Sequence, residues 1–141
     1  MMGIDHEILF SYIKDLSVET PNPESLIVAR ERLSKYSLKL DITSKALKNK
    51  MIEVNTKLIY RDEEQTKNRT NFEMVYATVI NIKDLKPDKN NLEKLLLCDV
   101  QIKIYPKIQK AFMEILKISG FPEVKISGNI DFVKLYEQRK N

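Results

Sequence analysis

The chain alternates between apolar and polar side chains along four separate stretches. In the first, residues 8–18, the even positions are mostly apolar or aromatic and the odd positions are mostly polar. A period of two is typical of a β-strand with one buried and one solvent-exposed face. We therefore expect a strand whose exposed face carries Asp15, Ser17 and Glu19, and whose buried face carries Ile8, Phe10, Tyr12, Lys14, Leu16 and Val18.

Three further stretches alternate in the same way. They are predicted strands at Tyr36–Thr43, Met51–Tyr60 and Phe72–Ile82, joined by a turn at Lys45–Asn49 and by a wholly polar, exposed connection at residues 61–70. The last of these strands is unusual because its second face is also apolar, with Val75, Ala77 and Val79. Since a contiguous exposed apolar patch is uncommon on a monomer, another element, another subunit or a bound chain must cover it.

The long helix predicted at residues 107–119 ends at Gly120, which suits the position after a helix C-terminus. Its apolar residues occupy a wider arc than the roughly 100° that covering one sheet requires. We therefore expect burial on two sides. Before it, helical and extended interpretations compete over residues 92–105, where Asn90 or Asn91 could cap a helix and Pro106 favours a break or kink.

Two shorter segments complete the predicted fold. A last helix over residues 130–140, capped by Asn129, has Phe132, Leu135 and Tyr136 on its apolar side. Residues 22–35 form either a helical turn or a crossover loop, and Ile27 and Val28 are apolar enough to pack on the sheet or contact a bound chain. Together the elements predict an α+β protein: a four-stranded antiparallel sheet with one long and one short C-terminal helix, in a single domain over residues 1–141.

The composition argues against an enzyme. The lone Cys98 and the lone His6 supply neither a nucleophile–base pair nor a metal framework, and the three glycines form no phosphate-binding loop. Asp15 and Glu19 stand about 13 Å apart at strand rise, too far for a carboxylate pair in acid–base catalysis. We expect no catalytic residues, no metal and no cofactor.

No apolar run approaches the roughly 20 residues of a membrane span, so no direct membrane insertion is expected. No signal peptide is visible, which favours the cytoplasm.

The chain is basic, with 24 Lys and Arg against 20 Asp and Glu and a formal charge of +4. A basic domain can bind nucleic acid, because Lys and Arg neutralise phosphates. The basic residues are mostly scattered among acids, however, and the densest cluster, Lys45, Lys48 and Lys50, lies in the predicted turn. An ordinary solvated loop is the favoured interpretation, and no nucleic-acid partner is expected. A small basic nucleic-acid-binding module is kept as the least favoured alternative.

Two separated segments carry a family resemblance. The wording YIKDLSVETPNP, residues 12–23, resembles the first strand of the SecB family of bacterial protein-export chaperones, and residues 105–138 resemble that family's helix, turn and closing helix. The resemblance implies a chaperone that holds unfolded preproteins without ATP and delivers them to the export motor ATPase (SecA). It also implies a homotetramer built as a dimer of dimers, with the long helices between the sheets. The residues of the long helix expected at the contact between subunits are Ile108, Phe112, Ile115 and Leu116. The positive net charge departs from the acidic character typical of the family's export members.

The resemblance also implies functional positions. The matching acids of the family dock the motor ATPase, which here points to Asp15, Glu19 and Glu73. The family binds clients in apolar grooves between sheet, crossover and last helix, for which the candidates are Ile27, Val28, Val75, Val79, Phe132, Leu135 and Tyr136. An alternative function keeps the fold and changes the client: a SecB-like chaperone dedicated to one partner, such as an antitoxin.

Overall fold

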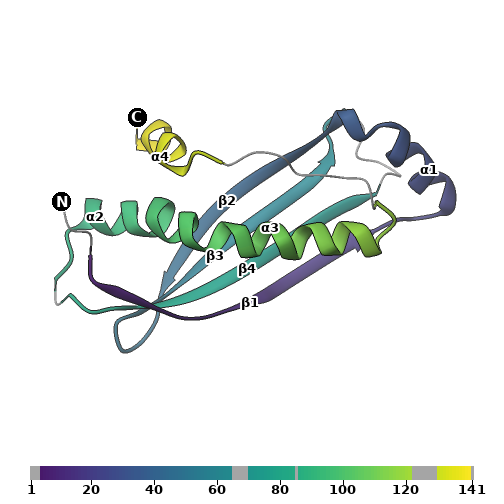
Figure 1. Ribbon diagram of the computed structural model, residues 1–141. Helices are drawn as coiled ribbons and strands as arrows, with labels where there is room; N and C mark the ends of the chain where they lie inside the picture. The colour runs from purple at the N-terminus through teal and green to yellow at the C-terminus, as the bar shows by residue number, and fades with distance from the viewer. Residues whose placement is uncertain (1–3, 65–69, 85, 122–129, 141) are drawn as a thin grey trace.

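The computed structural model describes residues 4–64, 70–84, 86–121 and 130–140, and the side chains of all of these except 139 and 140 (Figure 1). Four strands form one antiparallel sheet in the order β1-β4-β3-β2: β1 (His6–Glu19), β2 (Tyr36–Ala46), β3 (Met51–Asp62) and β4 (Asn71–Ile82). One long and one short C-terminal helix, α3 (Val100–Ile118) and α4 (Phe132–Lys140), follow it, so the predicted α+β fold is confirmed.

The long helix α3 lies along one face of the sheet, which we call the inner face (Figure 1). Ile108, Phe112 and Leu116 of α3 are fully buried against Leu58 and Met74, which lie on the inner face of β3 and β4. Burying one such side chain stabilises a fold by about 2 kcal/mol. The opposite face of the sheet, which we call the outer face, carries the alternate residues of each strand. On it Asp41 of β2 pairs with Lys57 of β3, and Lys57 pairs with Val75 of β4.

The first strand contains two β-bulges, between Ile8 and Phe10 and between Ile13 and Asp15. Each bulge inserts one residue and so reverses which parity of residue faces the core. Phe10 and Tyr12 pair with Val79 and Ala77 and therefore lie on the outer face, as Lys14 does, and their predicted burial on the core face is wrong. Ile8, Leu16 and Val18 pair with Ile80, Met74 and Phe72 and lie on the inner face as predicted, where Ile8 and Val18 are partly buried but Leu16 is 40% exposed.

Helical structure begins well before residue 107. It runs from α2 (Lys89–Lys94) through a π-helical turn, Leu95–Asp99, into α3, and Asp88 rather than Asn90 or Asn91 caps it by accepting the Asn91 N–H at 3.2 Å. The predicted break at Pro106 is wrong. A proline inside a helix costs about 3 kcal/mol, but Ile104, Tyr105 and Ile108 beside it are buried and contribute more than that together.

The crossover between β1 and β2 is helical. Helix α1 (Pro23–Glu31) is capped by Asn22, whose Oδ1 accepts the Ser25 N–H at 2.8 Å, and a 3₁₀ turn at Leu33–Lys35 follows. Arg32 then donates to the fully buried carboxylate of Asp62 with Nε and Nη2, at 2.6 and 3.2 Å. This bidentate pair raises the pKa of Arg32, chiefly through the hydrogen bond to Asp62, and it fixes the end of the crossover to β3.

Other boundaries follow from local hydrogen bonds. The turn between β2 and β3 spans residues 47–50, and Lys45 belongs to β2. Residues 61–70 are not wholly exposed, because Asp62 and Thr70 are buried, and residues 65–69 lie outside the described residues.

Gly120 has a φ of 105°, as expected after a helix C-terminus. Helix α4 starts at Phe132 with Asp131 accepting the Lys134 N–H at 3.0 Å, whereas the expected cap Asn129 lies outside the described residues.

Candidate polypeptide-binding site

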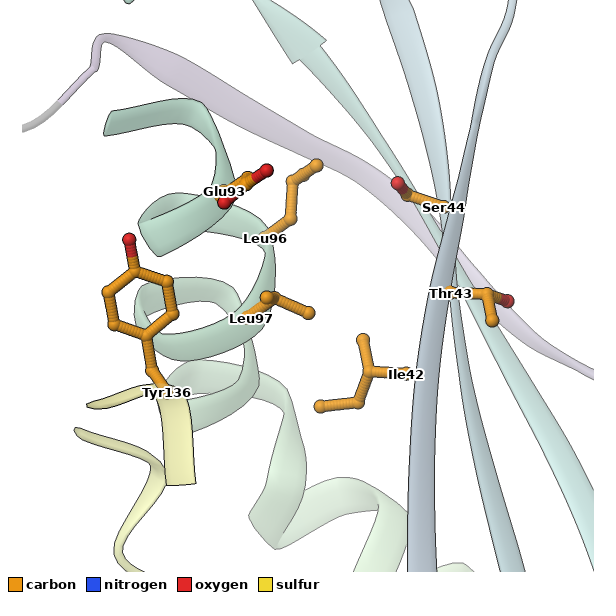
Figure 2. Close-up of a pocket in the computed structure, with 7 residues that line it drawn as sticks. All are labelled: Ile42, Thr43, Ser44, Glu93, Leu96, Leu97 and Tyr136. Carbon is orange, nitrogen blue, oxygen red and sulfur yellow. The ribbon is translucent and has the colours of Figure 1, made fainter. Parts of the chain in front are cut away.

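A pocket of about 500 Å³ opens between the edge strand β2, the π-helical turn and α4. Figure 2 shows Ile42 and Ser44 of β2 and Leu96 and Leu97 of the π-helical turn facing one space, while Thr43 points to the other side of β2. Tyr136 of α4 completes the lining. Its apolar walls are Ile42, Leu96, Leu97 and Tyr136, and Thr43, Ser44 and Glu93 add polar groups at its margin. Such a mixture suits an apolar side chain with its attached backbone better than it suits a small charged metabolite.

Two contacts hold α4 against this pocket. The Tyr136 hydroxyl donates to the Asn90 carbonyl oxygen at 3.3 Å. Phe132, one turn earlier, is buried and meets the ring of Tyr105 edge-on at a centroid distance of 5.4 Å. Tyr136 is therefore positioned as a wall, while Phe132 anchors the helix to α3.

The predicted groove residues fall on three separate surfaces of the single chain. Tyr136 lines the pocket, Phe132 lies beneath it, and Leu135 is 44% exposed outside the lining. Ile27 and Val28 lie on α1, at the far end of the sheet from α4 (Figure 1). Val75 and Val79 lie on the outer face, opposite α3. One chain does not bring these three groups together.

Sequence reasoning missed most of the pocket. Ile42 belongs to the predicted strand Tyr36–Thr43, whose pattern gives no sign of a pocket, and Leu96 and Leu97 belong to the stretch for which helical and extended interpretations compete. The run Leu95–Leu97 held the available signal, because three consecutive leucines exceed what one buried helix face needs. Two of them face the pocket, and Leu95 is buried in the core.

The outer face brings together the three acids predicted to dock the motor ATPase. Ser17 pairs with Glu73, and Asp15 and Glu19 flank Ser17 with the same orientation. Asp15 and Glu19 are exposed, whereas Glu73 forms an ion pair with Lys57 at 2.6 Å that raises the pKa of Lys57. The same face carries the bases Lys14, Lys39, Lys45, Lys57 and Arg61, so its charge is mixed rather than acidic.

A hydrogen-bonded network covers the apolar outer side of β4. The Glu53 carboxylate, on β3, accepts hydrogen bonds from Lys14 Nζ at 2.6 Å, Asn55 Nδ2 at 3.0 Å and the Tyr12 hydroxyl at 3.2 Å. Lys14, then Asn55, hold the pKa of Glu53 below its ordinary value. Tyr12 and Lys14 reach Glu53 by crossing β4, which explains why Val79 and Ala77 are buried without any second chain.

Three of the four residues predicted for the subunit contact, Ile108, Phe112 and Leu116, are fully buried within one chain, and Ile115 is partly exposed.

Cys98 is buried too, and burial raises the pKa of its thiol. Among the described residues, no group of three or more His, Cys, Asp and Glu side chains could hold a metal ion. Within that same part of the chain, no helix is long and apolar enough to span a membrane.

The fold and the pocket define a class: a small α+β protein with an antiparallel sheet covered by one long helix and an apolar pocket beside its edge strand. Residues 4–141 match the family model described as preprotein translocase subunit SecB. The chain therefore belongs to the SecB family of protein-export chaperones.

Relatives and a solved structure agree with this assignment. The chain is 42% identical over 140 residues to a protein-export SecB relative from Pelagibacter ubique, covering 99% of this chain and all of the relative. It is 32% identical to a SecB of Parvibaculum lavamentivorans, covering 94% and 77%. A SecB-like chaperone of Mycobacterium tuberculosis, solved with an antitoxin peptide, shares the fold with a TM-score of 0.65 at 11% identity, over 88% of this chain and 90% of that one.

Proposed function

We propose that the protein holds unfolded preproteins in the cytoplasm without ATP and delivers them to the export motor ATPase. The observation that carries the proposal is the apolar pocket between β2, the π-helical turn and α4 in a chain of the SecB family. Apolar burial is non-directional and needs no particular client sequence. A pocket of about 500 Å³ can therefore accept apolar side chains from many unfolded chains.

We propose Tyr136, Leu96, Leu97 and Ile42 as client contacts in this pocket. Ile27, which is 57% exposed on α1, would offer a second apolar contact to a client long enough to reach the other end of the sheet. An unfolded chain can span that distance because it extends by more than 3 Å per residue. Val28, Val75, Val79 and Leu135 stay candidates for the same long client.

For motor docking we propose the outer face, with Asp15 and Glu19 as the free carboxylates. Glu73 contributes less charge because Lys57 pairs with it. The partner surface would be basic, as in the family. We expect the double change Asp15→Lys and Glu19→Lys to abolish binding of the motor ATPase and to leave client holding unchanged. If both activities persist, this assignment of the outer face is wrong.

For assembly we propose a homotetramer built as a dimer of dimers, in which β1 makes the first contact. Among the described strands, β1 is an edge strand, and it exposes apolar side chains on both of its faces: Leu9, Phe10, Ile13 and Leu16 are each at least 40% exposed. An apolar edge strand pairs readily with another chain. The second contact would use residues other than Ile108, Phe112 and Leu116, because these fill the core of each chain.

A dedicated-partner function is the second candidate. It is favoured by the fold shared with the mycobacterial SecB-like chaperone, which is bound to an antitoxin peptide. The pocket would then select one partner sequence rather than many clients. Nucleic-acid binding is less favoured, and rests on the net charge of +4 alone.

The test is light scattering of a secretory precursor diluted from denaturant, with and without the protein, at low and high salt and without nucleotide. A general holding chaperone suppresses scattering near stoichiometry at both salt concentrations, because apolar contacts do not weaken with ionic strength. Absence of suppression would contradict the general function and favour a dedicated partner. Salt-sensitive binding of an oligonucleotide would favour the nucleic-acid module instead.

A further inference from the structure

Another pocket, of about 250 Å³, lies on the outer face of the sheet, on the side away from α3 (Figure 1). Four residues that pair across the strands line it, from Asp15 on β1 through Val75 and Lys57 to Asp41 on β2. We call it the outer-face pocket. In the homotetramer proposed above the long helices lie between the sheets, so this pocket stays on the outside of the assembly.

The two lysines of the outer-face pocket are neutralised by glutamates. Lys57 forms an ion pair with Glu73 at 2.6 Å, and Lys14 forms one with Glu53 at 2.6 Å. An anionic occupant would have to break one of these pairs before it could use a lysine. Phosphate groups, and therefore nucleic acid, fit this pocket poorly.

The two aspartates of the pocket are not neutralised. Asp15 and Asp41 are exposed, and neither forms an ion pair within the described residues. The pKa of Lys57, which lies between them, is raised chiefly by its hydrogen bond to Glu73, and the charges of Asp41 and Asp15 raise it further. The buried Oδ1 of Asn55, in the wall, also has no hydrogen-bond partner in the described part of the chain. The pocket therefore offers acceptors to a cationic donor, although the chain as a whole carries a charge of +4.

The spacing of the two aspartates selects among cations. Asp15 and Asp41 stand three inter-strand gaps apart, about 14 Å, which is too far for one metal ion or one guanidinium group to meet both. An extended polypeptide rises about 3.3 Å per residue, so side chains four positions apart stand about 13 Å apart on one face. The side chain midway between them points the same way and would meet Val75, the apolar residue of the row.

We propose that the outer-face pocket binds an extended basic polypeptide segment, in which two cationic residues stand four positions apart with an apolar residue midway. The cationic side chains pair with Asp15 and Asp41, and the apolar side chain covers Val75. This site rests on the docking role proposed above for the outer face, and it extends that surface from β1 across the sheet. Asp41 and Val75 thereby determine which basic segments are accepted.

The probe is a synthetic peptide with blocked ends, Arg-Ser-Leu-Ser-Arg. Its control, Ser-Arg-Leu-Arg-Ser, has the same composition but places the two arginines two positions apart. Binding to the assembled protein is followed by titration of the Val75 methyl signals in NMR spectra, which report on the pocket itself. The proteins are the wild type, Asp41→Asn and, as a control with the same change in charge, Glu31→Gln, which is exposed on α1.

We expect the first peptide to shift the Val75 signals of the wild type and to bind Asp41→Asn about fivefold more weakly, because one exposed ion pair is lost. Glu31→Gln should bind within about twofold of the wild type, and higher salt should weaken binding to all three proteins. The control peptide should bind more weakly to the wild type and should not distinguish it from Asp41→Asn. Val75 signals that do not move, equal binding of the two peptides, or equal binding by the wild type and Asp41→Asn would overturn the proposal.

Binding of the export motor ATPase to the same proteins separates this inference from the proposed function. If Asp15→Lys with Glu19→Lys abolishes motor binding while Asp41→Asn leaves motor and peptide binding unchanged, the docking function stands and the outer-face pocket is not its contact. If the first peptide binds in an Asp41-dependent way but the wild type does not bind the motor ATPase, the pocket serves another basic partner and motor docking is wrong.

Discussion

Tyr12 on β1 and Glu53 on β3 meet across the intervening strand β4, with the Tyr12 hydroxyl 3.2 Å from Glu53 Oε2. The contact exists because the bulge after Ile8 turns Phe10 and Tyr12 toward the outer face. The Tyr12 side chain then lies over Ala77 and Val79 and joins Lys14 and Asn55 at one carboxylate. A polar network thus shields apolar positions that would otherwise need a partner.

This network predicts a pH-dependent contribution to stability. The pKa of Glu53 is lower in the folded protein than its ordinary value of 4.5, so its stabilisation is present above pH 4.5 and is lost as the pH falls through the lower folded value. We expect Glu53→Gln to lower the free energy of unfolding by about 1 kcal/mol at pH 7. The difference from the wild type should shrink below about pH 4.5 in urea titrations.

The matched control for Glu53 is Asp41→Asn on the same face, where the carboxylate is exposed and has no ion pair within the described residues. Its effect should stay within about 0.5 kcal/mol at every pH. A Glu53→Gln effect that is equally large at pH 7 and at pH 3 would show that packing, and not the charge of the carboxylate, stabilises this region.

The strands could be predicted because a period of two survives any tertiary arrangement. The same alternation that located Tyr36, Met51 and Phe72 near strand starts also placed Val75, Ala77 and Val79 correctly on one face of β4. A bulge leaves no comparable signal. The residue types of Phe10 and Tyr12 are compatible with either face of the strand. Only the pairing register reveals that they lie on the outer face.

The pocket could not be predicted for a different reason. Its walls come from β2, the π-helical turn and α4, which are distant in the chain. No local pattern specifies that Ile42 and Tyr136 border one space. The break predicted at Pro106 is wrong because burial of Ile104 and Ile108 outweighs the local penalty of a proline inside a helix.

The turn between β2 and β3 offers a stabilising substitution. Asn49 and Lys50 have φ values of 61° and 60°, the left-handed conformation of a type I′ turn, and glycine is the usual residue at the second position. A side chain there costs about 1 kcal/mol. We expect Lys50→Gly to raise the free energy of unfolding by about 1 kcal/mol, which appears as a higher urea midpoint with an unchanged m-value. Lys48→Gly, outside the left-handed positions, should give no gain.

The pocket predicts a contrast between adjacent residues of α4. We expect Tyr136→Ala to weaken binding of an unfolded client about tenfold, because it removes an apolar wall. For a short client that fills the pocket alone, Leu135→Ala should change the affinity by less than about twofold, because Leu135 lies outside the lining. Tyr136→Phe tests the hydroxyl contact to Asn90 separately and should retain most of the affinity. Equal losses at 135 and 136 would place the client elsewhere on α4.

A buried polar contact joins α3 to the sheet. The Thr56 hydroxyl donates to Gln101 Oε1 at 2.9 Å, and Gln101 Nε2 donates to the Leu96 carbonyl oxygen in the π-helical turn at 3.4 Å. Both side chains are fully buried. Removing one partner leaves the other without a hydrogen bond in the core, and this costs about 2 kcal/mol. Replacing both by apolar groups of the same shape removes the unsatisfied group as well.

We therefore expect Thr56→Val and Gln101→Leu each to lower the free energy of unfolding by about 2 kcal/mol, and the double variant to lose less than the sum of the two. Urea unfolding of the four proteins gives the coupling energy directly. The double variant still lacks the Gln101 Nε2 donor to the Leu96 carbonyl oxygen, so recovery should be partial. Additive losses would mean that each side chain stabilises the core by packing alone, and that the Thr56–Gln101 hydrogen bond contributes nothing to how α3 sits on the sheet.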